Sequence, residues 1–537
     1  MGKEPALHFD VLIAGGGFAG VFCAKALVKE LGRTTKRRVA LVADENFMVF
    51  QPMLAEVVGS SLSPRHVVNP LRRLCPGATV LRGSVAGIDL AARQLELNAG
   101  DFSHNVPVQF DHLVMALGGN VDLSQVPGMP EHAYVLKNVG DAMRLRSAVL
   151  DRFEEANLIA HPKVLARLLT FVIVGGGYSG VETAGQILDL VNDMRHAYPG
   201  IAREHFRVVL VHSGPQLLPE ISSDLGAYCE RKLRERGVEV ITNARVTALT
   251  ASKVQLRSGQ VIEAHTVIST VGNAPHPLVV ELCRKHGFAS EKGRMVTEPT
   301  LRVPGQEKLW AGGDCAAVPH AEGGTCPPTA QFAVRQGRVL GRNVARALEG
   351  GADLEPLMFK GVGALAAIGH RTAVADVYGL KFSGFFAWWL WRTVYLSKLP
   401  GLERKLRVMI DWTLDLFFPR DITLLQARPT RVVKEVHLEP GDFVFHAGET
   451  AFSFYIVKAG RIDLTDRQGG TVRSFGPGDH FGERALLEDH LWRFNAVARE
   501  AATLVYLNAA IFNTIASSSK PIRELLLASA REIPPSR

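Results

Sequence analysis

Two glycine-rich turns carry the clearest chemical signal in this 537-residue sequence. They span residues 15–20 (GGGFAG) and 175–180 (GGGYSG). Each follows a short apolar run and precedes a helix-forming stretch, and this context gives a G-x-G-x-x-G pattern its meaning. The first glycine of such a motif makes a tight turn, the second lets the backbone approach a pyrophosphate, and the third lets the helix pack on the strand. The sequence therefore predicts two dinucleotide sites.

The elements that must position these turns form two βαβ units, which are the one internal duplication of the chain. Two dinucleotide sites in one chain indicate two redox cofactors, a flavin and a nicotinamide that reduces it. The N-terminus of each helix would present N–H donors to the phosphates. The expected strand, helix and strand are 9–13, 21–31 and 38–42 in the first unit, and 170–174, 181–194 and 207–211 in the second.

The acidic ribose partner that normally follows such a turn is irregular in both units. In the first, Ala43 occupies the expected strand end and Asp44 comes next, so Asp44 either binds the ribose or is a solvated turn residue. In the second, His212 takes this position and Ser213 follows. A neutral histidine does not repel a 2′-phosphate, yet no arginine stands beside it to bind one. The sequence leaves the choice between NADH and NADPH open.

Composition narrows the class of protein. The net charge is +8, and the six cysteines form no C-x-x-C pair. This argues against a disulfide scaffold, a zinc ribbon and a dithiol redox centre, and no metal-ligating set is predicted. There is no signal-peptide pattern, and no run reaches the ~18 apolar residues of a membrane-spanning helix. We expect a protein at the cytoplasmic face of the cell membrane, attached peripherally.

An aromatic segment at 382–391 (FSGFFAWWLW) indicates how the chain would reach a membrane. Lys381 and Arg392 bound this segment, and a basic run follows at 398–407. Aromatic residues interleaved with basic ones suit a helix that lies in the membrane interface. We therefore expect residues 380–420 to contact the membrane surface. The alternative is a core or dimer helix; since aromatic surfaces also suit subunit contacts, we expect a homodimer as well.

From these motifs the chain resembles the type II NADH:quinone oxidoreductases, within the FAD-dependent pyridine nucleotide-disulfide reductase superfamily. An ordered series of segments carries the resemblance over about residues 8–425, and such a series is highly specific. The segments are FQPML (50–54), FDHLVMALGG (110–119), VGGGYSGVETAG (174–185), STVGNAP (269–275), LWAGGDCA (309–316) and PPTAQFAVRQG (327–337).

The resemblance implies a role for each matching residue. Glu182 would lie near the nicotinamide, and Gln331 would lie near the quinone head. A second glutamine often follows one helical turn later in the family, but here Arg335 stands there with Gln336 beside it, which puts the quinone's identity in doubt. The cofactor-binding residues would be Gly15, Gly17, Gly20, Asp44 and Asp314 for FAD, and Gly175, Gly177 and Gly180 for NADH or NADPH.

Residues beyond about 428 resemble a cyclic nucleotide-binding domain. The match runs through EPGDFVFHAGE (439–449), FYIVKAG (454–460) and FGERALL (481–487). In that family Gly482 and Glu483 would open the phosphate-binding cassette, and Arg493 would pair with the cyclic phosphate of a bound cyclic nucleotide.

Three residues of this module depart from the family pattern. They are Arg484, Phe494 and Asn495. Phe494 would fill space meant for ligand, so a degenerate module used for contacts is the alternative.

The resulting fold class is α/β: two Rossmann-like dinucleotide-binding domains, an amphipathic membrane-surface segment and a small β-roll. The predicted function is NAD(P)H oxidation through FAD with electron transfer to a membrane quinone and no proton pumping, and regulation by the C-terminal domain is a further expectation. Two alternatives stay open, a cyclic nucleotide sensor with an idle flavin half and a flavin reductase of another acceptor such as a sulfur compound. Nucleic acid binding has no supporting motif. The expected domains are 1–125 with 275–350 (FAD), 126–274 (NAD(P)H), 351–427 (membrane or dimer segment) and 428–537 (cyclic nucleotide-binding-like).

Overall fold

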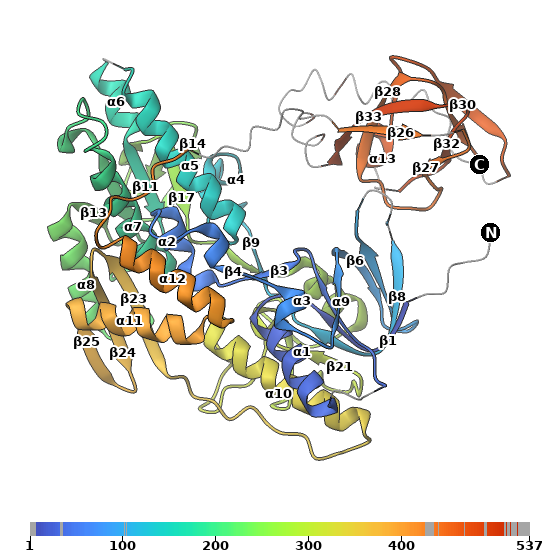
Figure 1. Cartoon of the computed structure of the whole chain (residues 1–537), viewed down its shortest axis with the longest axis horizontal. Helices are drawn as coiled ribbons and strands as arrows, with labels where there is room; N and C mark the ends of the chain where they lie inside the picture. Colours follow the sequence, from blue (N-terminus) through green and yellow to red (C-terminus); the bar gives the residue numbers. More distant parts are fainter. Residues whose placement is uncertain are drawn as a thin grey trace. The chain divides into compact units, whose positions relative to one another are not determined.

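The computed structural model divides the chain into two compact units. The first comprises residues 1–95 and 108–426, and the second comprises residues 96–107 and 427–537. Figure 1 shows both, coloured along the sequence. The structure describes residues 7–32, 36–100, 103, 105–159, 161–424, 434–438, 440–466, 468–487, 491–509, 512, 516 and 524.

The first predicted βαβ unit lies at the centre of a seven-stranded sheet. Strand β1 (Leu7–Ala14) pairs in parallel with β2 (Val39–Ala43) on one side and with β8 (Val106–Met115) on the other. Helix α1 (Phe18–Leu31) joins β1 to β2. Residues 11–14 are fully buried, as expected for a parallel strand covered on both faces. The remaining strands of this sheet are β5 (Thr79–Arg82), β6 (Ser84–Asp89), β7 (Gln94–Asn98) and β21 (Leu309–Ala311).

The second predicted unit forms a separate five-stranded sheet with all pairs parallel. Helix α7 (Tyr178–Met194) follows its central strand. Both motif helices begin three residues before the predicted start, because the last residues of each glycine turn already form the first helical turn. The strands, in spatial order, are β10 (Ala133–Val135), β17 (Thr266–Ser269), β11 (Thr170–Val174), β12 (Arg207–Val211) and β13 (Val238–Ile241).

Helix α10 (Ala330–Leu348) packs closely along α1. The contact depends on small residues: a Cβ added at Gly337 would lie 2.3 Å from the carbonyl oxygen of Ala19. No larger side chain fits between the two backbones without moving one helix. This packing fixes the N-terminal end of α10 beside the first glycine turn.

A three-stranded antiparallel sheet and two helices complete the first unit. Strands β23 (Gly363–Gly369), β24 (Thr372–Val377) and β25 (Leu380–Ser383) lead into α11 (Gly384–Lys398) and α12 (Leu402–Leu414). The two helices lie against each other (Figure 1). Within the described part of the chain, no helix has the length and apolarity needed to cross a bilayer.

In its described residues, the second unit contains a β-roll of two four-stranded sheets and a short helix, α13 (Glu483–Leu487). Its core is rich in aromatic side chains, among which Phe475, Phe481 and Phe512 are almost fully buried. The sequence prediction of a small β-roll is confirmed. The sheets are β26 (Lys434–Leu438), β33 (Ala502–Asn508), β28 (Ser453–Ala459) and β31 (His480–Phe481), and β27 (Phe443–Phe445), β32 (Asn495–Ala498), β29 (Ile462–Thr465) and β30 (Thr471–Phe475).

Candidate functional site

The first glycine turn has the geometry of a pyrophosphate cradle. Gly15 has φ +122°, and a Cβ there would lie 2.0 Å from the carbonyl oxygen of Ala116. A Cβ at Gly20 would lie 1.8 Å from the Gly15 carbonyl oxygen. At Gly17, which caps α1, a Cβ would meet no protein atom within 4 Å. The outer two glycines are therefore required by packing, whereas the middle one keeps open the approach to the helix N-terminus, where a phosphate binds.

The second glycine turn repeats this geometry. Gly175 has φ +116°, a Cβ at Gly180 would lie 1.8 Å from its carbonyl oxygen, and the space at Gly177 is again open. The amide N–H of Gly176 donates to Nδ1 of His212 at 3.1 Å. Burial also lowers the pKa of the His212 imidazole. His212 is thus fixed as a neutral ring at the end of β12, where ribose recognition is expected.

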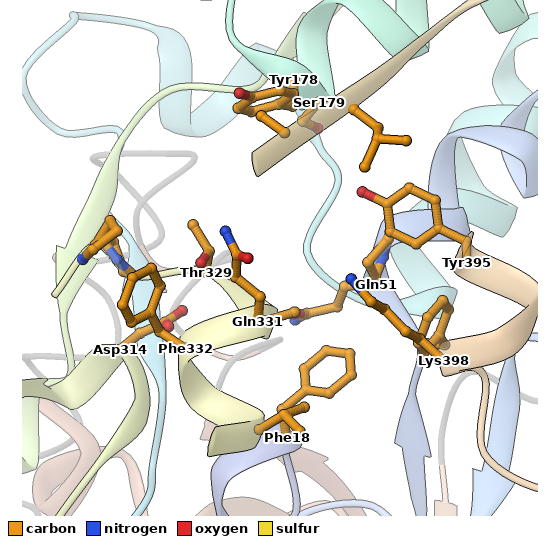
Figure 2. Close-up of a pocket in the computed structure, with 18 of the residues that line it drawn as sticks. Phe18, Gln51, Tyr178, Ser179, Asp314, Thr329, Gln331, Phe332, Tyr395 and Lys398 are labelled. Carbon is orange, nitrogen blue, oxygen red and sulfur yellow. The ribbon is translucent and has the colours of Figure 1, made fainter. Parts of the chain in front are cut away.

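A cavity of about 1400 Å³ brings several predicted residues together. Its volume exceeds the roughly 300–1,000 Å³ typical of single-ligand pockets. Gly177, Gly180, Glu182, Asp314 and Gln331 all line it, and Figure 2 shows the side chains of Asp314 and Gln331. Phe18 of the first glycine turn also lines the cavity, whereas Gly15, Gly17 and Gly20 of that turn lie outside the lining, as do Gly175, the exposed Asp44 and His212. The structure therefore joins the second turn to the predicted quinone residues.

Glu182 is a buried carboxyl in the wall of the cavity. Its Oε1 accepts a hydrogen bond from the backbone N–H of Ala367 and another from Nε1–H of Trp391, both at 3.1 Å. Burial raises the pKa of Glu182 to about 8. The protonated form therefore dominates at neutral pH, and this group is able to hold or release a proton near physiological pH.

Gln331 is the second residue of α10, and its amide group is held at both ends. Its Nε2–H donates to the carbonyl oxygen of Gly363 at 3.4 Å, and its Oε1 accepts from the N–H of Val362 at 3.2 Å. Figure 2 shows the amide pointing from α10 into the cavity, toward the side formed by Tyr178. A carboxamide fixed in this way can orient a carbonyl-bearing ligand.

The two residues at the position of the family's second glutamine have separate roles. Gln336 is buried, and its Oε1 accepts the N–H of Gly313, which holds the turn that carries Asp314. Arg335 faces the cavity with its guanidinium 3.7 Å from the ring centroid of Phe359. Arg335 therefore places a positive charge where the family often has an amide.

Helix α11 contributes cavity residues that the sequence analysis assigned to the membrane segment. Tyr395 and Lys398 line the cavity across from Asp314 (Figure 2). Burial, followed by the charge of Arg335, lowers the pKa of the Lys398 ammonium group. The spacing of Trp391, Tyr395 and Lys398 places them on one helix face. This spacing was the sequence signal that these three residues share a face, and a face that points inward must contact either the protein core or a ligand.

The predicted cyclic nucleotide residues lie around a much smaller cavity. It holds about 40 Å³, and Gly482, Arg493 and Phe494 are among its lining residues. Glu483 is buried, outside the lining. The rings of Phe445 and Trp492 stack beside it with centroids 3.6 Å apart at 5°. Aromatic side chains thus fill most of the space between the two sheets.

Sequence profiles of three families match this chain. The pyridine nucleotide-disulphide oxidoreductase profile matches residues 9–337, and the NDH2 C-terminal domain profile matches residues 362–421. A cyclic nucleotide-binding domain profile matches residues 435–519. Type II NADH:quinone oxidoreductase Ndh of Mycobacterium tuberculosis is 30% identical over 428 residues, which cover 78% of this chain and 90% of that protein.

The chain belongs to the type II NADH:quinone oxidoreductases. Demethylphylloquinone reductase NdbB of Synechocystis is 29% identical over 75% of this chain and 95% of its own length. The structure of NDH2 from Plasmodium falciparum in complex with NADH shares the fold, with a TM-score of 0.71 at 18% identity over 77% of this chain and 99% of that chain. The predicted α/β fold with a C-terminal cyclic nucleotide-binding-type module is confirmed.

Proposed function

We propose that this chain is a FAD-dependent enzyme that oxidises NADH or NADPH and delivers the electrons to a membrane quinone without pumping protons. The carrying observation is the large cavity, which connects the second glycine turn, Asp314 and the N-terminus of α10 with the inner face of α11. Bound flavin supplies the two-electron relay between the nicotinamide and the quinone. The protein's contribution is to bind, orient and control protons.

Each predicted site residue of the first unit has a defined part in this proposal. Gly15, Gly17 and Gly20 hold the FAD pyrophosphate, with Asp44 near the ribose and Asp314 near the ribityl or phosphate groups. Gly175, Gly177 and Gly180 hold the nicotinamide nucleotide. Glu182 lies beside the nicotinamide and keeps a proton available there. Gln331 orients the quinone carbonyl. The hydrogen bonds that fix Glu182 and Gln331 support these assignments.

The outer faces of α11 and α12 would bring the cavity to the bilayer. Their exposed apolar side chains suit a helix pair lying in the membrane interface, and we place them at the cytoplasmic face of the cell membrane. The same surface also suits a homodimer contact, which is the alternative use of part of it. The exposed apolar residues are Phe385, Phe386 and Trp389 of α11, and Leu402, Leu406, Met409, Ile410 and Leu414 of α12, with Leu416, Phe417 and Phe418 just after α12.

A thiol relay, as a sulfur-reducing enzyme would need, has no support in the cysteines. All six are buried and free. Burial raises the pKa of Cys315 and of Cys75 to about 11, whereas thiol chemistry requires the thiolate. Direct transfer from flavin to quinone therefore fits the structure better than transfer through a protein thiol.

Anaerobic flavin absorbance of the purified full-length chain tests the proposal. NADH or NADPH is added first and a short-chain quinone second. We expect the flavin band to bleach with the nicotinamide and to return with the quinone. Bleaching without return would assign another acceptor, and a protein without a flavin band would favour the sensor function.

A further inference from the structure

Two buried carboxyls of the first unit each hold a tryptophan from the helix pair α11 and α12. Glu182 on α7 accepts from Trp391 of α11, and Glu56, on helix α2 (Leu54–Val58), accepts from Trp412 of α12, each at 3.1 Å. All four side chains are less than 10% exposed. The centroids of the Trp391 and Trp412 rings lie 6.2 Å apart. The two hydrogen bonds are chemically alike, yet only Glu182 lines the large cavity.

The two carboxyls differ in what stabilises their charged forms. Glu56 has nearby cations, since the positive charges of Arg392 and Arg420 both favour its ionised form. Glu182 has only the Ala367 amide and the Trp391 indole favouring its ionised form. Loss of the indole donor would therefore remove one of two such contacts from Glu182.

We propose that Trp391 is a positioning residue that sets the orientation and charge of Glu182, so that the seating of α11 is coupled to the active-site carboxyl. This inference rests on the proposed function, in which Glu182 lies beside the nicotinamide. Trp391 continues the inward face of α11 that carries Tyr395, and their rings lie 4.7 Å apart. The opposite face of the same helix exposes Phe385, Phe386 and Trp389. A shift of α11 at a membrane surface would thus change the donor on Glu182.

If Glu182 lost the hydrogen bond from Trp391, its charged neighbours would not replace the lost stabilisation of the carboxylate, because they oppose its ionisation. The negative charge of Glu56, from α2, raises the pKa of Glu182. No cation is among the groups that act on it. A hydrogen bond to a carboxylate favours the charged form, so its loss raises the pKa further. The other titratable groups that interact with Glu182 are Tyr178 on α7, Tyr395 on α11 and Cys229 on α8 (Ser223–Arg236).

The test is the pH dependence of flavin reduction by NADH, followed by stopped-flow absorbance of the flavin-loaded protein. Glu182→Gln should remove the inflection that belongs to this carboxyl. Trp391→Phe keeps the ring but loses the donor, and should move that inflection upward by about one pH unit, a tenfold change in the ionisation constant. Trp412→Phe is the matched control: it removes the equivalent donor from Glu56, which then carries less negative charge, so it should not move the inflection upward.

Equal flavin content and melting temperature of the two phenylalanine variants would show that both fold. An inflection unmoved by Trp391→Phe, or moved equally by Trp412→Phe, would overturn the role of Trp391. An inflection that survives Glu182→Gln would also overturn it, because the proposed effect acts through that carboxyl. If NADH did not reduce the flavin of the wild-type protein, that result would instead contradict the proposed function itself.

Discussion

Replacement of His212 by aspartate should make the second dinucleotide site discriminate against NADPH in favour of NADH. His212 directly follows β12 and accepts the N–H of Gly176 at 3.1 Å through Nδ1, which requires that nitrogen to be unprotonated. A neutral ring neither repels nor attracts the 2′-phosphate of NADPH. An aspartate can accept the same amide while adding a negative charge.

The size of the effect follows from the partial burial of this position. His212 is half-buried, so the electrostatic screening lies between that of water and that of the protein surface. At about 4 Å, two like charges repel by roughly 1 kcal/mol in water and roughly 4 kcal/mol near a protein surface. Since about 1.4 kcal/mol is a tenfold change, we expect at least a fivefold loss of kcat/KM with NADPH relative to NADH.

Steady-state reduction of a short-chain quinone with each nucleotide measures this ratio. His212→Asn is the matched control, because its amide oxygen accepts the Gly176 N–H without a charge. We expect the wild type and the asparagine variant to use the two nucleotides within about tenfold of each other. If the aspartate variant lost activity equally with NADH and NADPH, the 2′-phosphate would not lie near this side chain and the reasoning would be wrong.

Three further predictions concern other parts of the molecule. Gly20→Ala should lower both the melting temperature and the flavin content, because its Cβ would overlap a backbone carbonyl oxygen. Gly17→Ala should fold normally and lose only flavin retention. Thermal unfolding and flavin absorbance distinguish the two outcomes. Burial raises the pKa of Glu56 to about 7, well above its unfolded value. The free energy of unfolding, and with it the melting temperature, should therefore fall as pH rises from about 5 to 7. Glu56→Gln should make this fall smaller. The 40 Å³ cavity of the β-roll is far smaller than a nucleotide, so cAMP should not shift the melting temperature of the full chain, and the double variant Trp492→Ala, Phe494→Thr should gain a shift.

The sequence was sufficient to predict the elements whose chemistry is local. The two glycine turns predicted both βαβ units, because each turn must lie between its own strand and helix. The order of the motifs along the chain predicted the family. The expected β-roll was recognisable from the segments at 439–449, 454–460 and 481–487, which resemble a cyclic nucleotide-binding domain. The starts of α1 and α7 were placed three residues late, since motif glycines weaken the helical pattern without preventing the first turn.

Contacts between distant segments were not predictable. Trp391 and Lys398 were assigned to a membrane helix from their neighbours in sequence, because a single sequence does not reveal which element covers an aromatic or basic face. The pairing of Glu182 with Trp391 joins residues 209 positions apart. The separation of Gln336 from Arg335, one buried beneath a turn and the other facing the cavity, likewise depends on how α10 packs against its surroundings.

The two faces of α11 suggest why this helix has so mixed a composition. Its outer face exposes large apolar side chains, which would be costly in water unless they are covered. Its inner face supplies Tyr395 and Lys398 to the cavity wall and Trp391 to Glu182. If α11 lies at the bilayer as proposed, a quinone that leaves the membrane beside its outer face would reach the cavity past residues of the same helix. A helix with this double role has to be apolar outside and polar inside, and its placement has to be fixed from within, as the buried Trp391–Glu182 and Trp412–Glu56 hydrogen bonds do.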